Sequence, residues 1–262
     1  MWNRPNQEFV QSQDLPWRPV PDDSFGAGGG VARELSTDPD DGALSALVHL
    51  RAPQRGRLHS GADLYVLDGA GTVNGRPYGP GHYLYLRPGA GLDLTPIGGP
   101  TTVFLGTFGP PDLTAGAGSG PGEVEHVDVE SLAWSVPSWH GADAEEASAP
   151  DGAVKWLRRD DRGLVFISAK LPGWRSPREE VHPMYEESFR ISGDFWVGAP
   201  GVMRAGSYFY HRPGFWHGPL YSRDGTASLI RADAEITTEY REPGLVDRPD
   251  ADYRNLPHPA LG

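Results

Sequence analysis

Short runs of β-branched, aromatic and aliphatic residues recur along the chain between turns that are rich in glycine and proline. Runs of this length and composition are typical of β-strands, and too short and too often interrupted for long helices. They fall into two sets, on either side of residues 109–122. The runs are Leu44–Leu50, Leu64–Leu67, His82–Leu86, Leu92–Thr95 and Thr101–Phe108, then Leu164–Leu171, Ser188–Ile191, Phe195–Val197, Ser207–Tyr210 and Ala227–Arg231. The pattern predicts an all-β fold.

The segment between the two sets, Gly109–Gly122, is dominated by glycine and proline. Such a segment neither extends a strand ladder nor starts a helix well. The 262 residues are enough for two domains of about 100–150 residues each. We therefore predict one domain over residues 1–122 and another over 123–262. The proline-rich ends, Met1–Gly30 and Glu242–Gly262, are expected to form arms that lie on a surface.

The two halves also resemble each other in sequence. The segment Leu64–Gly69 matches Ser188–Gly193 at an offset of 124 residues, and Arg87-Pro-Gly89 matches Arg212-Pro-Gly214 at an offset of 125. A nearly constant offset between matching motifs is the signature of an internal repeat. The economical explanation is two copies of one small barrel.

Composition and charge exclude several classes of partner and of chemistry. The net charge of −12, without a Lys/Arg block, disfavours nucleic acid and anionic membrane surfaces as partners. The absence of cysteine excludes disulfides, thiolate metal sites and a cysteine nucleophile. No apolar run has the length of a signal-peptide core or of a membrane span, so we expect a soluble, cytoplasmic protein. Phosphate-binding loops and the serine-hydrolase elbow are also missing, which leaves a small-molecule substrate as the expected partner.

Three potential metal ligands lie close together in the second half: Glu180, His182 and Glu186. Residues two apart on a strand face the same side, so these three side chains are expected to enter one barrel from one strand region. His217 has to reach them from elsewhere, and the turn predicted at Arg212-Pro-Gly214 would direct it there. Imidazole and carboxylate ligands favour iron, manganese, zinc or nickel over calcium.

The same residues carry a resemblance to the cupin superfamily, whose first motif runs Gly-(x)5-His-x-His-(x)3,4-Glu-(x)6-Gly. Here Glu180 stands in place of the first histidine, followed by His182, Glu186 and Gly193. The second motif, Gly-(x)5-Pro-x-Gly-(x)2-His, is met by Gly206, Gly214 and His217, with Arg212 at the usual proline position. The tandem arrangement resembles a bicupin of the ChrR-like kind. The resemblance implies two jelly-roll barrels, one divalent metal ion in the second, and pairing of two copies of the chain as a homodimer.

The first copy departs from the motif at every ligand position. The repeat offset places Gly56, Leu58, Ala62 and Leu92 where the second copy has its four ligands. We therefore expect the first barrel to bind no metal and to have a structural role. His59 lies one residue out of register, so its side chain should face away from the barrel interior.

Residues near the predicted ion are candidates for other roles. Tyr185 and His211 are candidate acid/base groups, and Arg190 is either a solvated surface residue or a clamp for a substrate carboxylate. Aromatic residues near the motifs would form barrel core for the most part, with a few in an apolar pocket; they are Trp174, Tyr185, Phe189, Trp196, Tyr208, Tyr210, Phe215 and Trp216.

Three functions remain open at this point. The resemblance favours a dioxygenase-type oxidoreductase. The same ion could instead act as a Lewis acid in an isomerase, lyase or hydrolase, with Glu180 as general base if Glu180 does not bind the metal. A cupin that binds a ligand without catalysis is the third alternative. If Glu180 points outward, His182, Glu186 and His217 would still form a site with two histidines and one carboxylate.

Overall fold

The computed structural model describes residues 3–114, 124–136, 152–198 and 200–242. These residues divide into two compact units: residues 1–5 with 12–133, and residues 6–11 with 134–262. The predicted domain boundary between residues 122 and 123 lies outside the described residues and stays a prediction. The C-terminal arm, residues 243–262, also lies outside the described residues.

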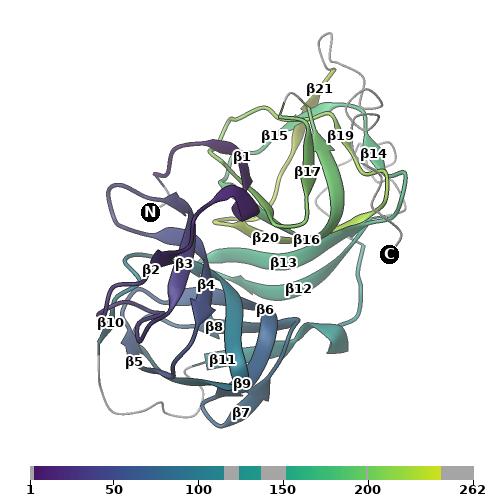
Figure 1. Ribbon diagram of the computed structural model, residues 1–262. Helices are drawn as coiled ribbons and strands as arrows, with labels where there is room; N and C mark the ends of the chain where they lie inside the picture. The colour runs from purple at the N-terminus through teal and green to yellow at the C-terminus, as the bar shows by residue number, and fades with distance from the viewer. Residues whose placement is uncertain (1–2, 115–123, 137–151, 199, 243–262) are drawn as a thin grey trace. The chain divides into compact units, whose positions relative to one another are not determined.

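Unit 1 is built on a ten-stranded antiparallel sheet with the strand order β11-β8-β6-β9-β4-β3-β2 along its main path (Figure 1). Its strands are β2 (Arg18–Pro19), β3 (Val31–Thr37), β4 (Leu44–Leu50), β5 (Gln54–Leu58), β6 (Ala62–Val73), β7 (Arg76–Tyr78), β8 (His82–Leu86), β9 (Ala90–Thr107), β10 (Leu113–Thr114) and β11 (Val124–Asp128). Two short 3-10 helices, η1 (Ser12–Asp14) and η2 (Val129–Ser131), belong to the same unit.

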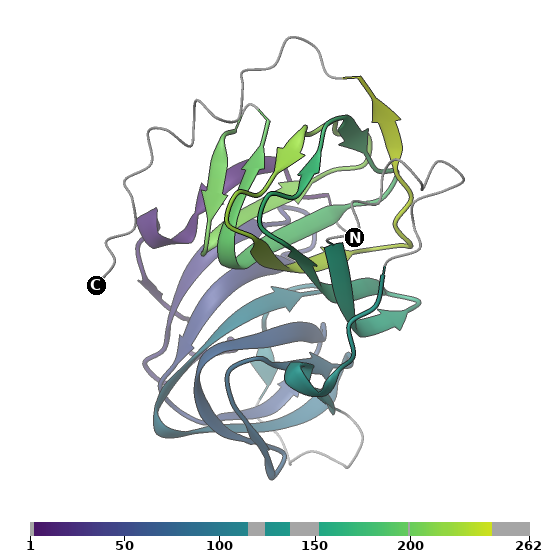
Figure 2. The same ribbon diagram turned by 90° about the vertical axis from the view of Figure 1, so that its right-hand side faces the viewer.

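Unit 2 contains a nine-stranded sheet with the main order β1-β18-β16-β20-β13-β12, and a separate pair, β15 with β21 (Figures 1 and 2). Its strands are β1 (Gln7–Gln11), β12 (Gly152–Asp160), β13 (Gly163–Lys170), β14 (Arg175–Ser176), β15 (Glu179–Val181), β16 (Glu186–Val197), β17 (Val202–Arg204), β18 (Ser207–His211), β19 (Leu220–Tyr221), β20 (Thr226–Ala232) and β21 (Glu239–Arg241). No α-helix occurs among the described residues, so none of these residues forms a helix that could cross a membrane.

The two sheets repeat one strand order. The series β8-β6-β9-β4-β3 in unit 1 corresponds to β18-β16-β20-β13-β12 in unit 2. The strand at the next edge position differs in origin, because unit 1 uses β11 and unit 2 uses β1 from the beginning of the chain. The all-β jelly-roll fold that the sequence predicts is confirmed.

Two pairs of predicted strands are single strands in the structure. Residues 92–95 and 101–107 are parts of β9, which ends one residue before the predicted strand does, and residues 188–191 and 195–197 are parts of β16. The ladder of β16 shifts register between Arg190 and Ser192, and Gly193 follows with a positive φ of 75°. A bulge of this kind lets a strand continue through a glycine that reads as a turn in the sequence.

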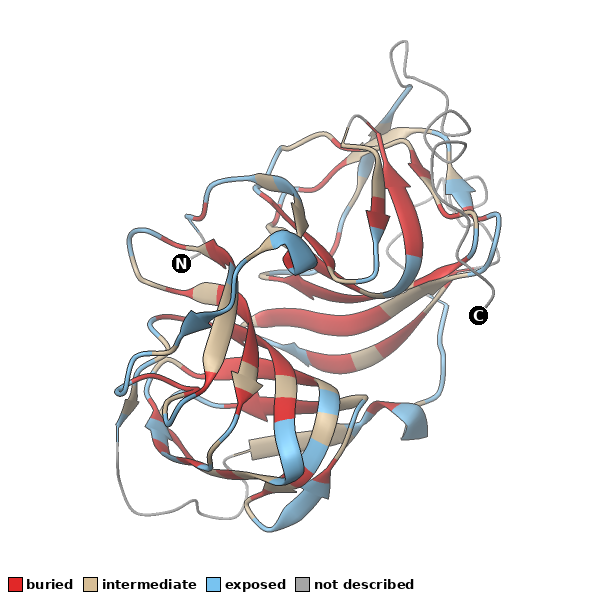
Figure 3. Ribbon diagram, viewed as in Figure 1, coloured by how far each residue is buried: buried red, intermediate tan, exposed pale blue. Residues whose placement is uncertain are grey.

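The interiors of the two units differ in polarity. In unit 1, apolar side chains from β4, β5, β6, β8 and β9 pack into a continuous cluster. Leu58, Ala62 and Leu92 are all completely buried in it. In unit 2, one apolar cluster surrounds Phe166 and another surrounds Phe209. Members of both clusters line a cavity whose wall also contains polar side chains. Strands β13 and β16 are buried along most of their length (Figure 3). Polar side chains of both strands nevertheless line this cavity.

Candidate metal centre

Backbone pairing brings the two sequence motifs of unit 2 together. Glu180 and His217 form an antiparallel bridge, in which each backbone N–H donates to the carbonyl of the other at 2.8 and 3.0 Å. The turn after β18 closes where the sequence predicts it, since the Phe215 N–H donates to the Arg212 carbonyl at 3.1 Å. The Gly214 N–H also donates to the His182 carbonyl at 2.9 Å, which ties this turn to the first motif.

The corresponding residues of unit 1 pair in the same register. Gly56 of β5 lies opposite Leu92 of β9, just as Glu180 lies opposite His217. The repeat offset taken from the sequence is therefore correct at this position. His59 is exposed and contacts Thr114 Oγ1 at 2.7 Å, so its side chain faces away from the interior as expected.

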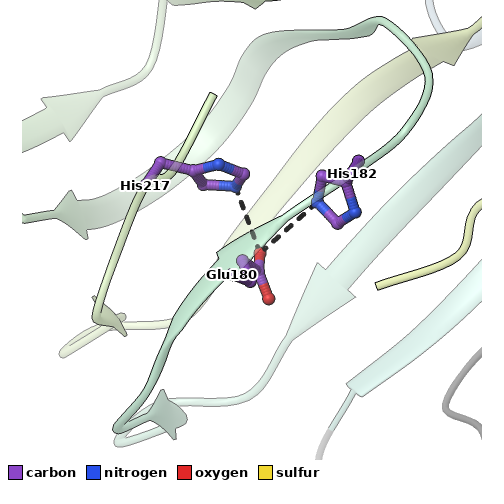
Figure 4. A group of neighbouring side chains, drawn as sticks. All are labelled: Glu180, His182 and His217. Atoms are coloured by element: carbon purple, nitrogen blue, oxygen red, sulfur yellow. Dashed lines mark ion pairs between the residues drawn. The ribbon is translucent and has the colours of Figure 1, made fainter. Parts of the chain in front are cut away.

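The two histidines bring the four predicted ligands close together in unit 2, since each imidazole lies near both carboxylates. His217 Nε2 lies 3.3 Å from Glu180 Oε1 and 3.7 Å from Glu186 Oε2. His182 Nε2 lies 3.5 Å from Glu186 Oε2 and 3.9 Å from Glu180 Oε1. Figure 4 shows Glu180 between the two imidazoles. Side-chain exposures are only 4–16%, so Glu180 points inward rather than to solvent.

One expectation about these ligands is wrong in detail. Glu180 and His182 flank the end of β15, but the strand stops at Val181 and Glu186 begins a new strand, β16. The intervening Pro183 lacks a backbone N–H, which disfavours a continuous ladder. The carboxylate of Glu186 returns to the same side because β16 starts after the turn, not because strand parity persists from Glu180 onward.

Each histidine has its Nδ1 atom against a backbone carbonyl. His182 Nδ1 lies 3.1 Å from the Thr237 carbonyl, and His217 Nδ1 lies 3.4 Å from the Phe215 carbonyl. A carbonyl only accepts, so both Nδ1 atoms carry hydrogen and both Nε2 atoms face the carboxylates. This is the orientation that histidine ligands of metal ions adopt.

One carboxylate oxygen of this group lacks a hydrogen bond. Glu186 Oε2 is buried and has no hydrogen-bond partner. Leaving a buried charged acceptor without a partner costs about 1–3 kcal/mol or more, so a cation is the natural occupant of this point. Ligand atoms bound about 2.1 Å from one ion lie roughly 3–3.5 Å apart, close to the shorter separations measured here. The residues present therefore fit a divalent ion.

Without an ion, protons compensate part of the negative charge. Burial raises the pKa of Glu180, but its hydrogen bond to His217 and the charges of His217, His182 and Lys170 outweigh burial and lower the pKa to about 2. Burial lowers the pKa of His217, whereas its hydrogen bond to Glu180 and the charges of Glu180 and Glu186 raise it, with a net upward shift. A proton between these two residues stands where a metal ion would bind.

His211 is close to this group but is held differently. Its ring stacks on Phe209 with a centroid distance of 4.2 Å and lies 4.6 Å from the ring of His217. Both of its nitrogens are buried without a hydrogen-bond partner. Burial, and then the charges of His217 and His182, lower its pKa well below the ordinary value, so the ring is neutral. Two groups of three side chains have ligand atoms close enough to share an ion: Glu180 with His182 and His217, and Glu186 with His211 and His217. The two groups overlap at His217.

Tyr185, the other candidate acid/base residue, packs against Tyr210 with the ring centroids 5.7 Å apart. Neither Tyr185 nor His211 is among the residues that line the cavity beside the ligands. Their catalytic roles stay predictions.

A cavity of about 100 Å³ opens beside the four ligands. Of the aromatic residues expected around the ion, Trp174 lines it, whereas Phe189, Tyr208 and Tyr210 are buried at alternate positions of β16 and β18 and face the other side. Phe166, Phe195 and Phe209 supply the aromatic wall instead. Arg190 is also part of the wall and is 3% exposed, so the expectation of a solvated surface residue is wrong.

Residues 106–239, slightly more than half of the chain, match the family described as "Domain of unknown function (DUF4437)". The chain belongs to the DUF4437 family. The matched region contains all four candidate ligands of this DUF4437 protein. None of the curated proteins that were compared matches it.

Solved structures show the same fold at low identity. A candidate dioxygenase from Nostoc punctiforme is 21% identical, with a TM-score of 0.74 over 92% of this chain and 88% of that one. Oxalate decarboxylase from Bacillus subtilis, in its structure at pH 4.6, is 14% identical, with a TM-score of 0.59 over 89% and 78%. Ylba from E. coli is 14% identical, with a TM-score of 0.56 over 87% and 92%. At these identities the likeness concerns the fold alone.

Proposed function

We propose that this DUF4437 protein is a metal-dependent bicupin enzyme that acts on a small organic substrate, most simply as a dioxygenase-type oxidoreductase. The observation that carries the proposal is that the imidazoles of His182 and His217 each lie near Glu180 and near the buried Glu186 Oε2, which has no hydrogen-bond partner. One divalent ion of iron, manganese, zinc or nickel would be held by these four side chains. Bound there, it would supply Lewis acidity and, as iron or manganese, redox chemistry with oxygen.

Residues around the site orient the candidate ligands and leave space for a substrate. The Thr237 and Phe215 carbonyls fix the two imidazole rings with Nε2 toward the carboxylates. Four protein ligands leave open positions on a six-coordinate ion, and the adjoining cavity is the space into which a substrate would fit. The aromatic residues of that cavity exclude water and orient the substrate. The bicupin description is supported by the shared strand order of the two sheets.

A second candidate reaction keeps the ion but not oxygen. One similar structure is an oxalate decarboxylase by its description, and Lewis-acid chemistry of the lyase, isomerase or hydrolase type needs only the same ligands. A ligand-binding protein without catalysis is the alternative from another class, in which removal of the ion would change stability alone.

Elemental analysis of protein purified without added metal tests the proposal, with His217→Ala as the comparison. We expect one ion per chain in the wild type and a large loss in the variant. Oxygen consumption with and without a candidate substrate then separates the reactions, because turnover that is undiminished without oxygen rejects the dioxygenase. Absence of any ion from the wild type, even after incubation with each of the four metals, would contradict the enzyme as proposed.

A further inference from the structure

A band of polar side chains crosses three neighbouring strands inside unit 2. Arg190 of β16 pairs with Ser228 of β20, which pairs in turn with Ser168 of β13. Two residues further along the ladder, Lys170 pairs with Thr226. All five residues line the same cavity as the four metal-ligand candidates. The cavity therefore has an acidic wall and a basic wall.

Arg190 is fixed in this basic wall. Its guanidinium donates to Thr226 Oγ1 at 3.0 Å and to Ser228 Oγ, and it lies 4.4 Å from the ring of Phe195. A buried guanidinium held by neutral hydroxyls keeps its full positive charge.

Lys170 is the more available of the two cations. It is one of only two lysines in the chain, and its Nζ lies 4.7 Å from the ring centroid of Trp174. Among the described residues it has no hydrogen bond and no carboxylate within ion-pair distance. Burial lowers its pKa, while the charges of Glu180 and Glu186 act in the opposite direction. An ammonium in a cavity wall without an anion lacks the partner that such a group normally has.

The charges around the cavity become unbalanced once a metal ion is present. Glu180 and Glu186 contribute two negative charges, and Lys170 and Arg190 contribute two positive charges. A divalent ion would leave an excess of about two positive charges in a largely buried space, which favours an anionic ligand. The cavity of about 100 Å³ suits a small ligand, since a cavity of about 150 Å³ binds benzene.

We propose that the substrate is a short-chain carboxylic acid whose carboxylate is bound by Lys170, with Arg190 adding charge, while its other end faces the metal ion. This inference rests on the proposed function, because it assumes a metal ion at Glu180, His182, Glu186 and His217. It adds the chemical class of the substrate and a binding residue that the cupin motifs do not contain.

Calorimetric titration of the metal-loaded protein with acetate and malonate tests this, with acetamide and malonamide as uncharged counterparts of similar size. We expect an acid to bind and its amide not to bind. Lys170→Met, which keeps an unbranched apolar stem over Trp174, should weaken acid binding by about tenfold or more. Lys170→Arg should recover part of the affinity. Lys155→Met is the matched control, because Lys155 also packs on a tryptophan, Trp134, at 4.9 Å but does not line the cavity.

Metal content is measured in every sample after titration, which separates the two hypotheses. An ion at full stoichiometry with no binding of either acid, or with equal binding in wild type and Lys170→Met, would overturn the carboxylate subsite and leave the metal enzyme standing. A wild-type protein that retains no ion would overturn both. If Lys170→Met does not fold, as judged by circular dichroism, Lys170→Gln takes its place in the same comparison.

Discussion

Glu186 and Glu187 are adjacent in β16 but face opposite sides of the sheet and have opposite surroundings. Glu187 is 1% exposed, forms an ion pair with the equally buried Arg231, and accepts from Tyr208 Oη at 2.6 Å. Glu186 has no arginine or lysine paired with it among the described residues, and its Oε2 lies 3.5 and 3.7 Å from the two imidazoles without a hydrogen-bond partner. One carboxylate is therefore satisfied by the protein, whereas the other one is suited to a ligand.

Replacing Glu186 tests whether its carboxylate binds a metal ion. We expect Glu186→Gln to lower affinity for a divalent ion by about tenfold or more, because a neutral amide replaces a charged ligand. In the metal-free protein the same variant should unfold at an equal or higher temperature than the wild type, since it removes a buried charge whose Oε2 has no hydrogen bond. Metal stoichiometry after dialysis and thermal unfolding in chelator are the two measurements. A metal-free variant that is clearly less stable would show that the carboxylate has a structural partner.

Replacing Glu187 should lower the stability of the fold and leave metal binding unchanged. Glu187→Gln leaves Arg231 buried without its counter-ion, and breaking a buried pair of this kind costs about 3–5 kcal/mol. The free energy of unfolding, measured by urea denaturation, should fall by that order. Metal content per folded chain should stay unchanged, because the side chain lies on the face away from the ligands. Loss of the ion together with intact stability would contradict this assignment.

The sequence predicted candidate ligands because the spacing of Glu180, His182 and Glu186 is a local property. Glu180, His182, Glu186 and His217 could be picked out from the motif, and the repeat offset correctly placed Gly56 opposite Leu92. Strand ends were harder to predict. The positive φ of Gly193 is compatible with a turn or with a bulge. The structure shows a bulge, because β16 pairs with β20 before it and with β17 after it. The all-β class needed only the recurrence of short apolar runs.

The basic wall of the cavity could not be predicted. Lys170 ends a strand in the sequence like many solvated lysines, and its position in the cavity depends on β13 pairing with β20 rather than on any motif. Arg190 is buried because Thr226 and Ser228, more than thirty residues away, accept its hydrogen bonds. The aromatic wall was partly wrong for a related reason: without strand register, alternate residues of β16 and β18 cannot be assigned to an inner or an outer face.

Stability of the metal-free protein should depend on pH through Glu180 and His217. The pKa of Glu180 falls from 4.5 to about 2 on folding, so its contribution is present above pH 4.5 and is lost as the pH falls toward 2. The pKa of His217 is raised above 6.5, so its contribution is present below pH 6.5 and is lost as the pH rises through the raised value. The pair therefore stabilises the fold most between about pH 4.5 and 6.5.

Glu180→Gln checks this window. The difference in unfolding free energy between metal-free wild type and variant should be largest between those pH values and should shrink on both sides. Metal binding should show the complementary trend and strengthen as the pH rises, because the ion displaces the proton that the pair shares. Urea denaturation in chelator gives the first quantity, and competition with a metal-binding dye gives the second. A difference that stays constant across and beyond the window would mean that the two side chains do not interact in solution.

Two glycines at repeat-equivalent positions should be indispensable for folding. Gly193 has φ +75°, and a Cβ atom there would lie 1.9 Å from the Gly225 carbonyl oxygen. Gly69 has φ +84°, and its Cβ would lie 2.5 Å from the Pro100 carbonyl oxygen. Both clashes involve backbone atoms, which cannot move aside as a flexible side chain can, so each Gly→Ala change should cost about 3 kcal/mol or more.

Gly89→Ala separates the clash from the backbone strain. Gly89 has φ +74° but no atom within 4 Å of the place that a Cβ would take, so alanine there should cost only about 1–2 kcal/mol. Urea denaturation of the three variants, monitored by tryptophan fluorescence and circular dichroism, gives the comparison. Similar losses at all three positions would mean that the left-handed backbone conformation, rather than close packing at the bulges, makes glycine necessary. Larger losses at Gly69 and Gly193 would mean that both sheets need glycine at the same position of the repeat. The two bulges lie in equivalent strands, since β16 begins at Glu186 and β6 begins at its repeat equivalent, Ala62.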